Sequence, residues 1–303
     1  MVFNDFEEKV TYAVKEKLGD DLEISSRKVC KNNGVIYTGI MAGTFERSVC
    51  PTVYIDGYYR EDMEDKDIED VADRISNILK ASVIEKSRDL ESIFEYDNIR
   101  DRIAFKLINT AMNKELLDDV PHRDFLDLSI CYYFDIKDGL VSSGQISGGT
   151  VVIHYSLMKK WNVTEDELYD IALKNMRDSH GDNIRSMIDL IKDRLPDENM
   201  DFDPEMYVLS NSKNLFGASA LIYSDLIKDL SDEKESDIFI LPSSIHELIL
   251  LPKNDLIPGS ELHNMVSEVN ETELDPQDIL SDSVYIYEKN SGTVRLASER
   301  DEN

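Results

Sequence analysis

A short polar segment between two apolar stretches carries the side chains best suited to catalysis. It reads LPSSIHELILL from residue 241 and contains Ser243, Ser244, His246 and Glu247. A serine, a histidine and a carboxylate are the components of a nucleophilic hydrolase site. In an extended strand, however, Ser244 and His246 would project in parallel and Glu247 would face the other side, and no Gly-x-Ser-x-Gly turn is present. The spacing therefore favours a structural role, with a serine capping the turn after Pro242 and His246 half-buried in a sheet.

A second polar segment reads PHRD from residue 121 and precedes an apolar run. His122 and Asp124 would share one side of a strand, as a metal-ligand pair or an acid–base pair could. A metal site would need a further histidine, His154 or His246, from a distant strand. The alternative is a turn in which Asp124 and Asp127 accept local hydrogen bonds. If the two polar segments lie side by side, His122 and Asp124 are the expected partners of His246.

The sequence contains no strong cofactor or metal motif. The segment SNSKNLFGAS from residue 210 lacks the Gly-Lys-Ser/Thr of a P-loop, and the glycines in 144–149 do not have dinucleotide-binding spacing. The three cysteines, Cys30, Cys50 and Cys131, have no metal-ligand spacing and cannot form a disulfide framework. We therefore expect no cofactor, no metal and a cytoplasmic protein with reduced thiols.

The chain is strongly acidic. Its 303 residues include 33 lysines and arginines and 62 aspartates and glutamates, for a formal net charge of −29. Residues 197–303 contain 24 of the acidic residues and seven of the basic ones, so the C-terminal third is the more acidic part. This charge disfavours direct nucleic-acid binding, and mimicry of DNA would require the acids to gather on one face. No run of about 18 apolar residues occurs, so we expect no membrane-spanning segment.

Hydrophobic periodicity and turn residues predict an α+β fold with mixed or largely antiparallel sheets and helices packed on them. An Asn33-Gly34 turn predicts a hairpin, and Thr164 with Glu167 predicts a helix capping box. The predicted helices cover residues 3–18, 64–93, 95–117, 156–195, 217–230, 260–270 and 276–280. The predicted strands cover residues 22–30, 35–43, 52–56, 125–136, 145–154, 206–211, 237–242, 243–252, 284–289 and 293–298.

The loop PDENMDFDP, residues 196–204, is the predicted boundary within the chain. It is polar, it begins and ends with a proline, and it coincides with the change in charge. We expect an N-terminal α+β region, residues 1–196, and an acidic C-terminal α+β region, residues 197–303, packed together as one compact unit.

Seven short motifs occur in a characteristic order along the chain. They are KNNGV (31–35), CPTVYID (50–56), KLIN (106–109), VPHRDFLDL (120–128), MYVLSNSKNLFGA (206–218), LPSSIHELIL (241–250) and LSDSVYIY (280–287). In this order they resemble an uncharacterised family, a domain-of-unknown-function group common in Gram-positive gut bacteria. The resemblance covers nearly the whole chain and implies one family-length unit in a bacterial cytoplasm. Because that family has no established activity, the resemblance implies no cofactor and no catalytic residue.

Two functions remain open at this point. The first is an acidic interaction or regulatory protein that binds another protein, one with a basic surface, and neither nucleic acid nor membrane. The second is a small hydrolase built around His246, with Ser243, Ser244 and either Glu247 or His122. The acidity and the lack of a catalytic motif favour the first. The geometry around His246 and His122 distinguishes the two.

Overall fold

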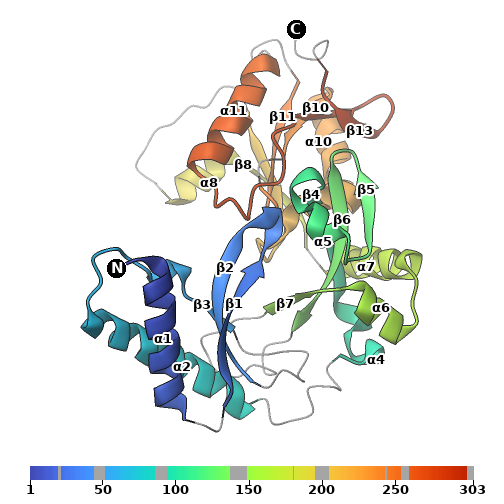
Figure 1. The fold of residues 1–303 in the computed structure, drawn as a ribbon. Coiled ribbons are helices and arrows are strands. Elements are labelled where there is room, and N and C mark those ends of the chain that lie inside the picture. The colour runs from blue at the N-terminus through green and yellow to red at the C-terminus, as the bar shows by residue number, and fades with distance from the viewer. Residues whose placement is uncertain are drawn as a thin grey trace. The chain divides into compact units, whose positions relative to one another are not determined.

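A computed structural model describes residues 1–19, 22–43, 52–85, 94–136, 149–179, 181–194, 205–242, 244–253 and 259–298. Over these residues the α+β prediction is confirmed, with three sheets in which every pairing of known register is antiparallel (Figure 1). Contacts group the chain into two compact units: Met1–Asn98 with Asp135–Val151, and Ile99–Phe134 with Val152–Asn303. The boundary expected at 196–204 lies outside the described residues and stays a prediction.

The first unit packs two helices against a three-stranded sheet of order β1-β2-β3. Its elements are α1 (Phe3–Leu18), β1 (Ile24–Cys30), β2 (Ile36–Ala42), β3 (Thr52–Tyr54) and α2 (Asp65–Glu85). Helix α1 forms as predicted because Phe6, Val10 and Val14 fall on one side and are fully buried. The predicted hairpin is also confirmed, since Asn33 and Gly34 both take positive φ angles, 59° and 69°, between the paired strands.

A four-stranded sheet has β6 (Leu128–Ile136) as its central strand, with β4 (Ile103–Asn109) on one side. On the other side β6 pairs with β5 (His122–Phe125) and with β7 (Gly149–Val152). The prediction of one helix over 95–117 is wrong. Short helical turns, α4 (Tyr96–Ile99) and α5 (Lys114–Leu117), flank β4 instead.

The sequence of β4 does not show the alternation of a half-exposed strand, because both sides of the strand are buried. Phe105 stacks on Tyr169 of α7 (Glu165–Ser179), with ring centroids 5.9 Å apart. The next residue, Lys106, projects from the opposite side and meets the ring of Phe216. Strands covered on both sides are continuous apolar runs without alternation, so periodicity alone does not separate them from helices.

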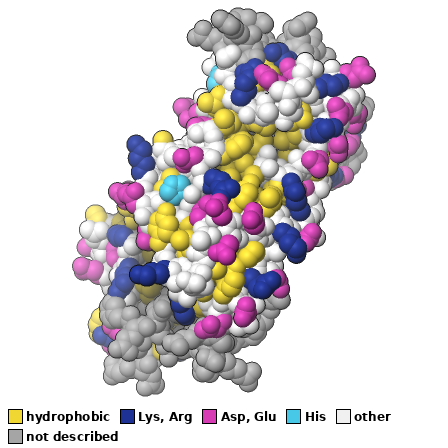
Figure 2. Space-filling view, turned by 90° about the vertical axis from the view of Figure 1, so that its right-hand side faces the viewer, with side chains coloured by type: hydrophobic (Ala, Val, Ile, Leu, Met, Phe, Trp, Pro, Cys, Tyr) yellow, Lys and Arg dark blue, Asp and Glu magenta, His cyan; other side chains and the backbone are white. Residues whose placement is uncertain are grey.

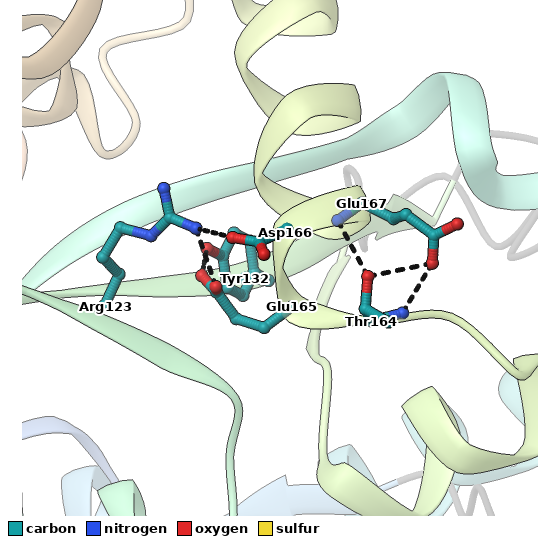
Figure 3. A network of polar contacts seen from close by, with 6 residues as sticks. All are labelled: Arg123, Tyr132, Thr164, Glu165, Asp166 and Glu167. Carbon is teal, nitrogen blue, oxygen red and sulfur yellow. Dashed lines mark hydrogen bonds and ion pairs between the residues drawn. The ribbon is translucent and has the colours of Figure 1, made fainter.

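The start of α7 is fixed by a network of polar contacts (Figure 3). Arg123 of β5 donates to Glu165 at 2.8 Å and to Asp166 at 2.7 Å, and the Tyr132 hydroxyl donates to Glu165. Burial, followed by the bond to Glu165, raises the pKa of Tyr132. The carboxylates at this helix N-terminus also oppose the positive end of the helix dipole. The network therefore anchors α7 to β5 and β6.

The predicted capping box completes that helix start. The Thr164 backbone N–H donates to Glu167 at 2.7 Å, and the Glu167 N–H donates to the Thr164 hydroxyl at 3.3 Å. The Thr164 backbone N–H, and after it the Thr164 hydroxyl, which donates to the same carboxylate at 3.0 Å, lower the pKa of the Glu167 carboxyl.

Replacing Thr164 with alanine is expected to lower the free energy of unfolding by about 1 kcal/mol, because one N-terminal N–H of α7 loses its acceptor. Urea unfolding followed by circular dichroism measures the change. Thr164→Ser, which keeps the hydroxyl, serves as the control and should stay near the wild type. Equal destabilisation by both substitutions would contradict the capping role.

The predicted helical stretch over 156–195 is interrupted. It consists of α6 (Tyr155–Trp161), α7, a strand β8 (Asn183–Ser186) and α8 (Met187–Arg194). Strand β8 pairs antiparallel with β9 (Tyr207–Ser210) and forms one edge of the larger sheet. Four residues give too short a pattern for a strand to be predicted between helices.

The larger sheet of the second unit has the order β13-β12-β10-β11-β9-β8. Its remaining strands are β10 (Ile238–Leu241), β11 (Leu248–Pro252), β12 (Tyr285–Glu288) and β13 (Thr293–Leu296), and its helices are α9 (Ala220–Tyr223), α10 (Leu226–Lys234) and α11 (Gly259–Thr272). Helix α11 packs through Leu262 and Val266 on Phe239, Leu251 and Ile286. One prediction is wrong here, because residues 276–278 form a turn rather than a helix. In the segment 243–252, which was predicted to be mostly strand, β11 spans Leu248–Pro252.

Candidate functional site

The His246 cluster consists of His246, Phe216, Asp278, Lys106 and Tyr133. The imidazole of His246 stacks on the Phe216 ring, with centroids 5.7 Å apart and planes 10° apart. Its Nδ1 accepts the backbone N–H of Phe216 at 3.2 Å, and its Nε2 lies 3.4 Å from Oδ1 of Asp278. The side chain of His246 is 29% exposed, so the cluster reaches the surface.

A tight loop brings Phe216 to the histidine. Asn211, which is 1% exposed, donates through Nδ2 to the Leu215 carbonyl at 2.8 Å. Its Oδ1 accepts the N–H groups of Lys213 at 3.1 Å and Leu215 at 3.3 Å. An asparagine side chain that satisfies backbone groups two and four residues ahead is a typical loop-forming device. The loop is thus held from within by one buried side chain.

Phe216 itself has a left-handed backbone with φ of 54°. This conformation costs a bulky residue on the order of 1–2 kcal/mol. The Phe216 ring offsets that cost through three contacts: the His246 stack, a perpendicular contact to Tyr133 at 5.0 Å, and the Lys106 Nζ at 4.9 Å from its centroid. Backbone strain of this kind concentrates at functional sites.

The serines and glutamate predicted beside His246 do not form a triad with it in the described residues. Ser244 is 5% exposed, and its Oγ accepts the backbone N–H of His246 at 3.1 Å, which makes it a turn residue. Glu247 is exposed to solvent. Ser243 lies outside the described residues. The acid that faces the imidazole is Asp278, which sequence spacing did not indicate.

The second predicted pair lies elsewhere in the unit. His122 directs Nδ1 toward the Val120 carbonyl at 3.0 Å, and Asp124 is exposed at the end of the same strand. His154 binds Asp119 at 2.7 Å instead of joining His122. Over the described residues, no hydrogen bond or ion pair links His122 to His246, and no group of three metal-ligating side chains is found. The structure therefore does not link the two predicted histidines by a hydrogen bond or an ion pair.

Asp127 organises a second cluster that the sequence indicated only as a local acceptor. Its carboxylate accepts hydroxyls from Ser281 at 2.6 Å, Ser283 at 3.0 Å and Tyr285 at 2.5 Å. Burial, together with the bond to Asp127, raises the pKa of Tyr285. This Asp127 cluster joins the turn between β5 and β6 to the start of β12. Three hydroxyl donors on one carboxylate suit a structural junction, because they leave little capacity for a ligand.

The fold and its clusters define an α+β protein with two compact units and antiparallel sheets. The chain belongs to the family of unknown function DUF5688, which it matches over residues 3–289. Among curated proteins and among solved structures, no match was found. In the part of the chain that the structure describes, no helix is long and apolar enough to cross a bilayer.

Proposed function

We propose that this protein is an interaction or regulatory protein and that the outer side of α11 binds a basic surface of another protein. The observation that carries the proposal is a set of exposed carboxylates on α11, here called the α11 acidic face: Glu261, Glu268 and Glu271. Spacings of seven and three residues put them on one side of the helix. The segment 254–288 contains no lysine or arginine at all.

These carboxylates differ from those acids of the same unit that have a basic partner. On α10, Asp232 pairs with Lys228 at 2.6 Å, and Lys234 pairs with Glu205 at 2.7 Å. Figure 2 shows lysine and arginine side chains interspersed among aspartates and glutamates over one face of the molecule. By contrast, no described lysine or arginine forms an ion pair with the α11 acidic face. An uncompensated field of this sign attracts basic partners and raises their association rate.

The hydrolase alternative has less support from the geometry. A general base needs a ring nitrogen that faces the substrate, whereas both nitrogens of His246 face protein groups. Ser244 binds the backbone of His246 rather than its ring.

The net charge of −29 counts against direct nucleic-acid binding. The proposal includes a cytoplasmic location, which the free thiols of Cys30 and Cys131 support.

Charge reversal tests the proposal. The full chain, the triple variant Glu261→Lys/Glu268→Lys/Glu271→Lys and a control are tagged, expressed in the native host and purified with their partners. The control, Asp5→Lys/Glu8→Lys/Glu16→Lys, makes the same change in charge at exposed positions of α1, a helix that also carries lysines. We expect a partner with a basic surface to be recovered with the wild type and the control but lost with the α11 variant. Equal recovery with all three proteins would contradict the proposal.

A further inference from the structure

The hydrogen bond at Nδ1 of His246 indicates which ring nitrogen carries the proton of the neutral imidazole. Nδ1 accepts the backbone N–H of Phe216, so Nδ1 carries no proton. The single proton of the neutral ring is therefore on Nε2, which faces Oδ1 of Asp278. The bond that holds the left-handed residue Phe216 thus requires a neutral imidazole.

We propose that the hydrogen bond from the Phe216 N–H to His246 Nδ1 holds the loop of residues 211–217 in place and breaks in acid. We call this bond the latch. Histidine is the side chain whose charge ordinarily changes between pH 5 and pH 8. When Nδ1 gains a proton, it becomes a donor that faces the Phe216 N–H, and two donors cannot form a hydrogen bond. Protonation of His246 therefore opens the latch at Phe216.

The groups around the ring do not restore the hydrogen bond to the Phe216 N–H once the ring is charged. Oδ1 of Asp278 lies 3.4 Å from Nε2, the ring nitrogen that does not contact Phe216, so it does not keep the latch closed. Behind Phe216 lie Lys106, whose Nζ is 4.9 Å from the ring centroid, and the edge-on ring of Tyr133. The stack of His246 on Phe216 is attractive for a charged ring as well as for a neutral one, so opening concerns the Phe216 N–H and not the contact between the rings. The left-handed φ of Phe216, 54°, also relaxes when the restraint is removed.

The other hydrogen bonds that hold the loop come from side chains that do not change charge between pH 5 and pH 8. Ser210 Oγ donates to the His246 carbonyl at 2.8 Å, and the Asn211 amide holds three backbone groups of the loop. Opening is therefore a local change at Phe216 and leaves the sheet intact. The proposal goes beyond the proposed function, because it does not depend on the α11 acidic face.

Nuclear magnetic resonance on the full 303-residue chain tests the latch. The Phe216 amide signal and the His246 ring signal are followed from pH 8 to pH 5. We expect one common midpoint, with protection of the Phe216 amide against hydrogen exchange about tenfold lower on the acidic side, after correction for intrinsic exchange.

Two variants complete the test. In His246→Asn, the side-chain oxygen can accept the Phe216 N–H but does not titrate, so the Phe216 signal should become independent of pH. His154→Asn, at an exposed histidine, should leave the Phe216 curve unchanged. A Phe216 signal that stays flat while His246 titrates overturns the proposal. So does a pH dependence that persists in His246→Asn, or a His246 that remains neutral down to pH 5; the wild-type curves decide the matter even if a variant fails to fold.

Discussion

Replacing Gly217 with alanine is expected to destabilise the protein by about 3 kcal/mol, because the position has no room for a methyl group. A Cβ there would lie 2.4 Å from Oγ of Ser210, 2.5 Å from the carbonyl oxygen of His246 and 2.9 Å from the backbone nitrogen of Asn211. Two of these three atoms belong to the backbone, so rotation of a neighbouring side chain cannot relieve the overlap. The loop must move away from His246, and the contacts of Phe216 are lost with it.

Urea unfolding measures the effect as a shift in the midpoint at constant slope. Gly57→Ala is the matched control, because a Cβ at Gly57 meets nothing within 4 Å and its φ is not positive. The control should stay within about 0.5 kcal/mol of the wild type. If Gly217→Ala is as stable as Gly57→Ala, the claim that the loop packs too closely against His246 to admit a methyl group is contradicted.

The second large effect is expected for Asp127→Ala, at about 3 kcal/mol, because it removes the acceptor of three hydroxyls. Tyr285 is fully buried and Ser281 is 2% exposed, so neither hydroxyl can turn to bulk water. A buried donor left without an acceptor costs about 1–3 kcal/mol.

Asp124→Ala provides the comparison for Asp127→Ala, because Asp124 lies on the same hairpin and is exposed. It removes the same carboxylate charge and should change the free energy of unfolding by less than about 0.5 kcal/mol. Chemical denaturation of both variants gives the difference. Similar values for the two variants would mean that the Asp127 cluster does not hold β12 against the β5–β6 turn.

Local signals in the sequence predicted those elements that depend on neighbouring residues. The β1–β2 hairpin follows from Asn33-Gly34, and the start of α7 follows from the Thr164–Glu167 capping box. Both features are fixed by hydrogen bonds within four residues, which a sequence pattern can express.

Elements whose form depends on distant contacts were not predicted. Strand β4 has the apolar spacing of a helix. It is a strand with both sides buried because Tyr169 packs on one side of it and Phe216 on the other. The partner of His246 was sought in Ser244 and Glu247, whereas Asp278 comes from a turn after α11. The left-handed conformation of Phe216 has no sequence signal, because phenylalanine rarely adopts it.

Zero-length cross-linking tests the central claim, that the α11 acidic face contacts a basic protein, most directly. A carbodiimide joins carboxylates to lysines that are in direct contact, so cross-links formed in cells of the native host and mapped by mass spectrometry identify both sides of an interface. We predict cross-links from Glu261, Glu268 or Glu271 to lysines of one partner, and their loss when the cells are lysed at high salt before the reagent is added. Cross-links to a partner that map only to other carboxylates, and not to α11, would contradict the account.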